Sequence, residues 1–148
     1  MSTPVPVRVS LLDHAVAPPS YQTEHAAGMD LVAAVQDLVE IAPGAVVAVP
    51  TGIRIEIPPG YEGQVRPRSG LAARHGIGIP NAPGTIDADY RGEVQVLLVN
   101  LGGAPYTVRR GDRIAQLVLS PVVRASIQIT VELTETARGA GGFGHTGR

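Results

Sequence analysis

Two aspartates stand two residues apart in a stretch whose residue types favour a pocket-lining turn. Asp87 and Asp89 lie within residues 81–93, which carry turn residues at both ends and a β-prone centre. This pattern predicts a β-hairpin that lines a pocket. On a regular strand both carboxylates would point to one face, close enough for one charge to influence the other. The pair would then be a general base and a spectator, or two solvated turn carboxylates, and both interpretations stay open.

Residues 67–72 combine a positive charge and a hydroxyl at the start of a predicted helix that covers residues 69–75. Free N–H groups at the start of a helix attract anions, so Arg68 and Ser69 suit a phosphate group. The alternative is that Ser69 only caps the helix, which Gly76 ends, and that Arg68 is a surface charge.

The C-terminal residues 138–148 are rich in glycine. Five glycines surround Phe143, the single phenylalanine of the chain, and an arginine stands at each end. Such a segment cannot build a core, and one interpretation is a disordered terminus. The other is a mobile arm that closes over a nucleotide, with amides and arginines on the phosphates and Phe143 on a base. It is not a Walker loop, because it lacks Gly-Lys-Ser/Thr and a following helix.

The composition excludes several kinds of chemistry. All 12 Lys and Arg residues are arginine, which excludes P-loop and Schiff-base lysines. There is no cysteine, so thiolate nucleophiles and cysteine-ligated zinc are excluded, and the 4 histidines have no metal-ligand spacing. A net charge of -1 offers no basic face to a polymeric nucleic acid or a membrane. No apolar run approaches a membrane span and residues 1–12 do not resemble a leader, so we expect a soluble, cytoplasmic protein.

Short strands must position these groups. With 18 Gly and 13 Pro among 148 residues, the chain leaves little room for long helices and suits one compact domain. The clearest alternation covers residues 51–57, with three isoleucines on one face and Arg54 and Glu56 on the other. Similar runs predict strands at residues 5–11, 46–49, 93–100, 114–119 and 127–131. Their regular spacing predicts an all-β sandwich or barrel with one short helix.

Two further segments, residues 27–31 and 111–116, place polar groups beside apolar strands. Taken with the three segments above, and in this order, they resemble the five motifs of the trimeric deoxyuridine triphosphatase (dUTPase) family. The resemblance implies a distorted jelly-roll β-barrel that forms a homotrimer, with active sites between subunits. It also implies a β domain over residues 1–137 and a mobile arm over residues 138–148 that reaches a neighbour's site.

The resemblance also implies a role for each matching residue. Asp87 would be the catalytic base that accepts a proton from the water attacking the α-phosphorus. Asp30 would act through water on a Mg²⁺ ion that the triphosphate holds. The ring of Tyr90 would pack under the deoxyribose and leave no room for a 2′-hydroxyl. The other expected substrate-binding residues are Asn81, Gly84, Thr85, Ile86 and Gln95 at the uracil, Arg68, Ser69, Gly70 and Gln116 at the phosphates, and Arg138, Phe143, Gly144 and Thr146 in the arm.

The implied reaction is hydrolysis of dUTP to dUMP and pyrophosphate, which limits uracil incorporation into DNA and supplies dUMP for dTMP synthesis. One alternative is a dCTP deaminase of the same fold, against which residues 89–91 and the Phe143 arm argue. Another is a non-catalytic trimeric module that binds nucleotides, against which intact Asp87, Arg138 and Phe143 argue.

Overall fold

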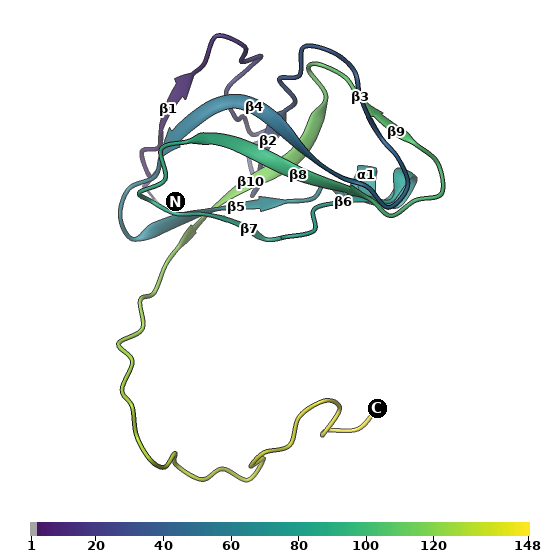
Figure 1. The fold of residues 1–148 in the computed structure, drawn as a ribbon. Coiled ribbons are helices and arrows are strands. Elements are labelled where there is room, and N and C mark those ends of the chain that lie inside the picture. The colour runs from purple at the N-terminus through teal and green to yellow at the C-terminus, as the bar shows by residue number, and fades with distance from the viewer. Residues whose placement is uncertain (1–2) are drawn as a thin grey trace.

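The computed structural model describes residues 3–148 and shows an all-β chain with one short helix, as the sequence predicts (Figure 1). No helix in residues 3–148 is long and apolar enough to cross a membrane. In chain order the elements are β1 (Arg8–Leu11), β2 (Met29–Val32), β3 (Val39–Ile41), β4 (Val46–Glu56), β5 (Tyr61–Arg66), α1 (Ser69–His75), β6 (Ile77–Gly78), β7 (Gly84–Ile86), β8 (Glu93–Asn100), β9 (Tyr106–Val108) and β10 (Arg113–Pro121).

The strands form two four-stranded antiparallel sheets and a two-stranded ribbon. The orders are β1-β4-β8-β6 and β2-β10-β5-β7, and β3 pairs with β9. In Figure 1, β4 and β8 form the upper layer, and β5, β7 and β10 form the lower one. Because each sheet turns an aliphatic face inward, one core of Ile, Val, Leu and Ala side chains joins the layers.

β4 illustrates how alternation leads to burial. Ile53 and Ile55 in the strand and Ile57 directly after it are 1%, 2% and 2% exposed, whereas Arg54 is exposed to solvent. The predicted half-buried strand is therefore confirmed. Burying each of these side chains stabilises the fold by roughly 1.5–3 kcal/mol.

The two strands predicted on either side of Pro50 are a single strand. β4 continues through Pro50, and its register with β8 shifts between Pro50 and Arg54. Proline cannot donate to a sheet ladder, so an irregularity is expected where it enters a strand. Gly52 takes a φ of 71° in this stretch, and a Cβ on it would lie 2.5 Å from Ala15 Cα. A larger residue at position 52 would therefore clash with the segment that follows β1.

The predicted hairpin over residues 81–93 is wrong. β7 pairs with β5 in one sheet, whereas β8 pairs with β4 in the other. The segment therefore crosses between the layers. Ile86 and Val94 are both buried, so each strand presents an apolar side chain to the core from its own layer.

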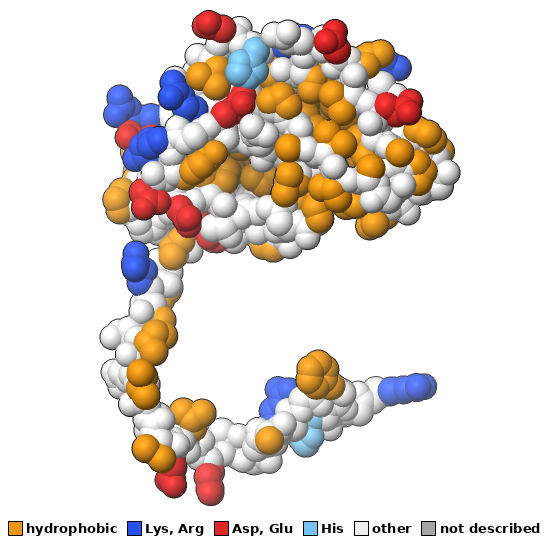
Figure 2. All heavy atoms as spheres, viewed as in Figure 1, with side chains coloured by type: hydrophobic (Ala, Val, Ile, Leu, Met, Phe, Trp, Pro, Cys, Tyr) orange, Lys and Arg blue, Asp and Glu red, His pale blue; other side chains and the backbone are white. Residues whose placement is uncertain are grey.

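The strand predicted at residues 127–131 is also wrong within the single chain. After β10 ends at Pro121, the chain leaves the sheets and forms no further strand (Figure 1). Ile127, Ile129 and Val131 are 82%, 99% and 101% exposed. In the space-filling view their segment stands apart from the body, with hydrophobic side chains along it (Figure 2). The apolar alternation is real, but the described part of the chain provides no strand to pair with it.

The hydroxyl of Tyr106 on β9 makes the fold less stable at alkaline pH. Its ring lies 5.0 Å from that of His75, centroid to centroid. Burial raises the pKa of the hydroxyl above 10.0, and the Asp112 carboxylate adds to the rise. Since the fold favours the neutral phenol, this contribution is complete below pH 10.0 and is lost as the pH rises through the folded pKa. Urea unfolding at pH about 8 and about 11 should therefore show a smaller loss of stability in Tyr106→Phe than in the wild type; equal losses would contradict this.

Candidate active site

The segment between β7 and β8 lines a cavity of about 300 Å³, a size that suits a small ligand. The prediction that this segment lines a pocket is therefore confirmed for Thr85, Ile86, Asp87, Tyr90 and Glu93, although the segment is not a hairpin. The lining residues are Thr85, Ile86, Asp87, Tyr90, Glu93, Val94 and Gln95.

Both aspartates lie in the turn that follows β7. The backbone N–H of Tyr90 donates to the Asp87 carbonyl oxygen at 3.1 Å, so the regular strand needed to place both carboxylates on one face is absent here. Both side chains are exposed, but only Asp87 lines the cavity. Asp87 is thus an accessible acceptor for a proton from a molecule in the cavity, whereas Asp89 is solvated.

Tyr90 forms another part of the cavity wall. Its hydroxyl donates to the Glu93 carbonyl oxygen at 2.8 Å, although the side chain is 44% exposed. This bond ties the ring to the first residue of β8. A fixed ring in the wall restricts which molecules can enter.

Gly84 brings Asn81 against the cavity segment. A Cβ at Gly84 would lie 3.2 Å from Asn81 Nδ2 and 3.3 Å from Val65 Cβ, both closer than ordinary packing allows. The Asn81 amide therefore rests beside the backbone of β7, and Asn81 belongs with the cavity residues although it does not line the cavity.

A second group of predicted residues lies at the start of α1. Arg68 occupies the N-cap position with φ -84° and ψ 127°, and no side chain caps the helix. The prediction that Ser69 caps the helix is therefore wrong: Ser69 is the first helical residue, because the extended conformation ends at Arg68. The prediction that Gly76 ends the helix is confirmed, with the left-handed φ of 68° that glycine readily adopts.

Asp30 holds this second group together. The carboxylate is 3% exposed, and its Oδ2 accepts a hydrogen bond from Arg113 Nη1 at 3.2 Å. Its Oδ1 lies 3.6 Å from Arg68 Nε, and Arg68 Nη1 donates to the Arg113 carbonyl oxygen at 3.1 Å. Gln116 faces Asp30 across the β2–β10 pairing. Two guanidiniums around one carboxylate leave an excess positive charge, which suits a phosphate.

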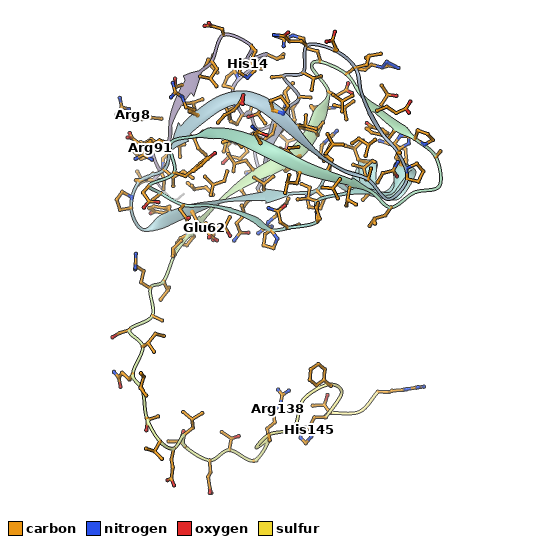
Figure 3. The ribbon with its side chains drawn as sticks, viewed as in Figure 1. Arg8, His14, Glu62, Arg91, Arg138 and His145 are labelled. Atoms are coloured by element: carbon orange, nitrogen blue, oxygen red, sulfur yellow. The ribbon has the colours of Figure 1, made fainter. Side chains whose placement is uncertain are left out.

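The arm forms a third group. Phe143 is fully exposed, and Arg138 Nε donates to the Gly141 carbonyl oxygen at 2.7 Å within the arm itself. Gly144 takes a φ of 88°, and Thr146 is exposed. Figure 3 places Arg138 and His145 well away from the sheets. Among the residues described, none of the arm or of the Asp30–Arg68 group lines the cavity that contains Asp87.

Comparison with known proteins assigns the chain to a family. The dUTPase family model matches residues 14–147. This chain belongs to the dUTPase family. The deoxyuridine 5'-triphosphate nucleotidohydrolase of Anaeromyxobacter sp. (strain Fw109-5) is 58% identical over 148 residues, covering 98% of this chain and 99% of the relative.

Solved dUTPase structures share the fold. The dUTPase of Staphylococcus bacteriophage 80alpha with dUPNHPP gives a TM-score of 0.84 at 26% identity, covering 97% of this chain and 99% of the phage chain. A mutant dUTPase from phage phi11 of S. aureus, described with a structural Mg(II) ion, gives a TM-score of 0.79 at 24% identity, covering 88% and 99%. The second likeness shows the fold alone.

One carboxylate of this dUTPase family member fits a water-mediated contact to magnesium. Asp30 Oδ1 is buried and has no hydrogen-bond partner among the described residues. It is therefore an acceptor to which a metal-bound water can donate. In residues 3–148, no three His, Cys, Asp or Glu side chains gather where they could hold a metal together. A metal acting here would take most of its ligands from the substrate and from water.

Sequence reasoning missed Glu93 and His14 in this dUTPase chain. Glu93 lines the cavity, and its Oε1 accepts from the backbone N–H of Gly52 at 3.1 Å and pairs with His14 Nε2. Arg110 Nη1 donates to the His14 carbonyl oxygen at 2.9 Å. His14 and Glu93 are 79 residues apart. No local pattern links them, so only the fold reveals the pair.

Proposed function

We infer that this member of the dUTPase family hydrolyses dUTP to dUMP and pyrophosphate. The family match and the 58% identical nucleotidohydrolase support this activity. The phage 80alpha dUTPase with dUPNHPP, a dUTP analogue, supports dUTP as the substrate. The structural observation that carries the assignment is the accessible Asp87 carboxylate in a cavity wall shared with Tyr90 and Gln95. The activity would limit uracil incorporation into DNA and supply dUMP.

Asp87 is the proposed general base. It accepts a proton from a water molecule whose oxygen forms the new bond to the α-phosphorus. The bond from the α-phosphorus to the bridging oxygen breaks, and its electron pair leaves with pyrophosphate. Support comes from the position of Asp87 directly after β7, where the carboxylate is exposed and lines the cavity.

The cavity wall is proposed to select uracil and deoxyribose. Main-chain groups from Gly84 to Asp87, with Asn81 and Gln95, would bond the uracil edge. Cytosine presents the wrong donor and acceptor, and such mismatches cost about 10⁴ to 10⁵ in selectivity. The tethered ring of Tyr90 would lie under the sugar and exclude a 2′-hydroxyl. The hydrogen bond from its hydroxyl to the Glu93 carbonyl oxygen supports this rigid role.

The Asp30–Arg68 group is proposed to receive the phosphates. Arg68, Ser69, Gly70 and Gln116 would contact the phosphate oxygens, because Asp30 and the Arg113 carbonyl oxygen hold the Arg68 side chain in place. Bound magnesium would neutralise charge on the triphosphate, with Asp30 touching one of its waters. The arm would add Arg138 at the γ-phosphate and Phe143 on the uracil, with Gly144 and Thr146 beside them.

The proposed active form is a homotrimer of distorted jelly-roll barrels with sites shared between chains. Two observations support sharing: the cavity and the Asp30–Arg68 group are separate in one chain, and the exposed alternation at residues 127–131 needs a strand from elsewhere. In this proposal residues 1–137 form the β domain, and residues 138–148 form the arm that reaches a neighbour's site. Because its substrate belongs to the nucleotide pool, we propose a cytoplasmic location.

The decisive experiment is product analysis with dUTP, dCTP, dTTP and UTP, each with magnesium and with chelator. We expect magnesium-dependent release of pyrophosphate from dUTP alone. Release of ammonia from dCTP would instead indicate a deaminase. No turnover of any nucleotide would indicate a binding module.

A further inference from the structure

We infer that Arg91 is a positioning residue for dUTP hydrolysis: braced by Glu56 on β4, its guanidinium holds the turn that carries Asp87 and Tyr90. The inference rests on the proposed function, since it takes Asp87 as the base. Arg91 lies outside the cavity of Asp87 and acts through the backbone of the turn.

The turn needs support from outside its own backbone. One backbone hydrogen bond closes it, from Tyr90 N–H to the Asp87 carbonyl oxygen at 3.1 Å. The side chains of Asp87, Asp89 and Tyr90 are all exposed. A segment with so little packing samples several conformations unless other bonds restrain it. Asp87 must hold the attacking water in line with the α-phosphorus, and such conformational freedom would displace it.

Besides the bond from the Tyr90 hydroxyl to the Glu93 carbonyl oxygen, the bonds that restrain the turn come from Arg91. Its Nη1 donates to the Ala88 carbonyl oxygen at 2.6 Å and to the Tyr90 carbonyl oxygen at 3.0 Å. Its Nη2 lies 3.3 Å from Glu56 Oε1. One planar guanidinium therefore joins two carbonyls of the turn to a carboxylate on the long strand β4. A lysine has a single nitrogen and cannot reproduce this fork.

The surroundings separate Arg91 from the reacting groups. It lines a different cavity of about 300 Å³ on the β1 and β4 side, together with Arg8, Arg54 and Glu56. Figure 3 shows Arg8 and Arg91 at this end of the sheets. Arg8 Nη1 binds the other oxygen of Glu56, Oε2, at 3.0 Å, with a side chain that is 84% exposed. Arg8 thus shares the carboxylate but, within residues 3–148, makes no hydrogen bond to the turn, so it is a matched control.

A structural role and a positioning role give different results. Exposed ion pairs contribute little to stability, so losing the Arg91–Glu56 pair should hardly change Tm. A displaced base slows the chemical step, and misplacement by about 1 Å costs up to roughly 10²-fold in rate. We expect Arg91→Gln to lower kcat about 10- to 100-fold, with a smaller change in KM. Arg91→Lys should restore part of kcat, and Arg8→Gln should match the wild type.

The test measures kcat and KM for dUTP, together with Tm, in Arg91→Gln, Arg91→Lys, Glu56→Gln and Arg8→Gln. Glu56→Gln should lower kcat less than Arg91→Gln, because the bonds to both carbonyls remain. Adding Glu56→Gln to Arg91→Gln should cost nothing further, because Glu56 acts through Arg91. A normal kcat in Arg91→Gln overturns the inference, as does an equal loss in Arg8→Gln. If Arg91→Gln does not fold, the test rests on the kcat values of the other three variants. Arg91→Lys and Glu56→Gln should then have a lower kcat than Arg8→Gln, and equal values would overturn the inference.

Asp87→Asn separates this inference from the proposed function. If Asp87→Asn strongly lowers kcat while Arg91→Gln is normal, only the role of Arg91 fails. If Asp87→Asn turns over normally, the proposed mechanism fails and the role of Arg91 with it.

Discussion

Asp87→Asn lowers kcat for dUTP by about 10² to 10⁴, the usual contribution of a positioned general base, with little change in nucleotide affinity. Asparagine has nearly the same shape, so the wall that it shares with Tyr90 and Gln95 is retained. Only the ability to take a proton is lost. Single-turnover kinetics with dUTP, alongside equilibrium binding of the non-hydrolysable analogue, measure the two effects separately.

Asp89→Asn is the matched control for this substitution. Asp89 lies in the same turn and is exposed, but it does not line the cavity. It should therefore change kcat by less than about threefold, as expected for a solvated side chain that takes no part in proton transfer. Near-normal turnover in Asp87→Asn would remove Asp87 from the mechanism. An equal loss in both variants would show that the charge of the turn matters and not the position of one carboxylate.

Removal of residues 138–148 lowers kcat/KM by about 10² to 10³, comparable to losing an oriented donor at the reacting phosphate. The truncation removes Arg138 and also Phe143, whose stacking on a base is worth roughly 1–3 kcal/mol. No residue of this segment belongs to the core, so Tm should not change. In the full chain, bound analogue should protect Arg138 from trypsin, and equal cleavage with and without analogue would contradict closure of the arm.

Mixed oligomers test which chain supplies the arm. Asp87→Asn subunits and arm-deleted subunits are co-expressed with different tags, and each parent by itself has only the low residual activity expected above. If an arm serves a neighbour's cavity, one of the three sites in each mixed trimer combines an intact base with an intact arm. Activity in hybrids purified through both tags is therefore expected. Hybrids as inactive as their parents would place the arm on the cavity of its own chain.

Local patterns were sufficient where a structure depends on nearby residues. The bounds predicted for β8 and for α1 agree with those in the structure. In β8 every second side chain is buried, as an alternating run requires. The helix ends where Gly76 supplies a left-handed conformation. Part of the cavity wall was predictable for the same reason, because Asp87 lies in a continuous segment with turn signals at both ends. Tyr90 and Gln95 were assigned their places at the sugar and the uracil only through the family resemblance.

Local patterns could not predict which strands pair with each other or which distant side chains come into contact. Residues 81–93 have the turn signals of a hairpin, yet β7 and β8 join different sheets because β5 and β4 are available to pair with them. Residues 127–131 alternate like a strand, but alternation alone does not say which strand lies alongside. The roles of Glu93 and Arg91 depend in the same way on His14, Gly52 and Glu56, which the fold brings near from distant segments.

The exposed apolar side chains after β10 affect how the mixed oligomers should be prepared. Ile127, Ile129, Val131 and Leu133 are each at least 82% exposed in one chain. Covering four such side chains gives roughly 6–12 kcal/mol, of the same order as the whole stability of a typical domain. In the proposed trimer, burial of these side chains would thus contribute substantially to holding the subunits together. Slow exchange of subunits is therefore expected, and co-expression is the suitable way to assemble the hybrids. Ile129, although 99% exposed in the single chain, would then respond to substitution as an interior residue does.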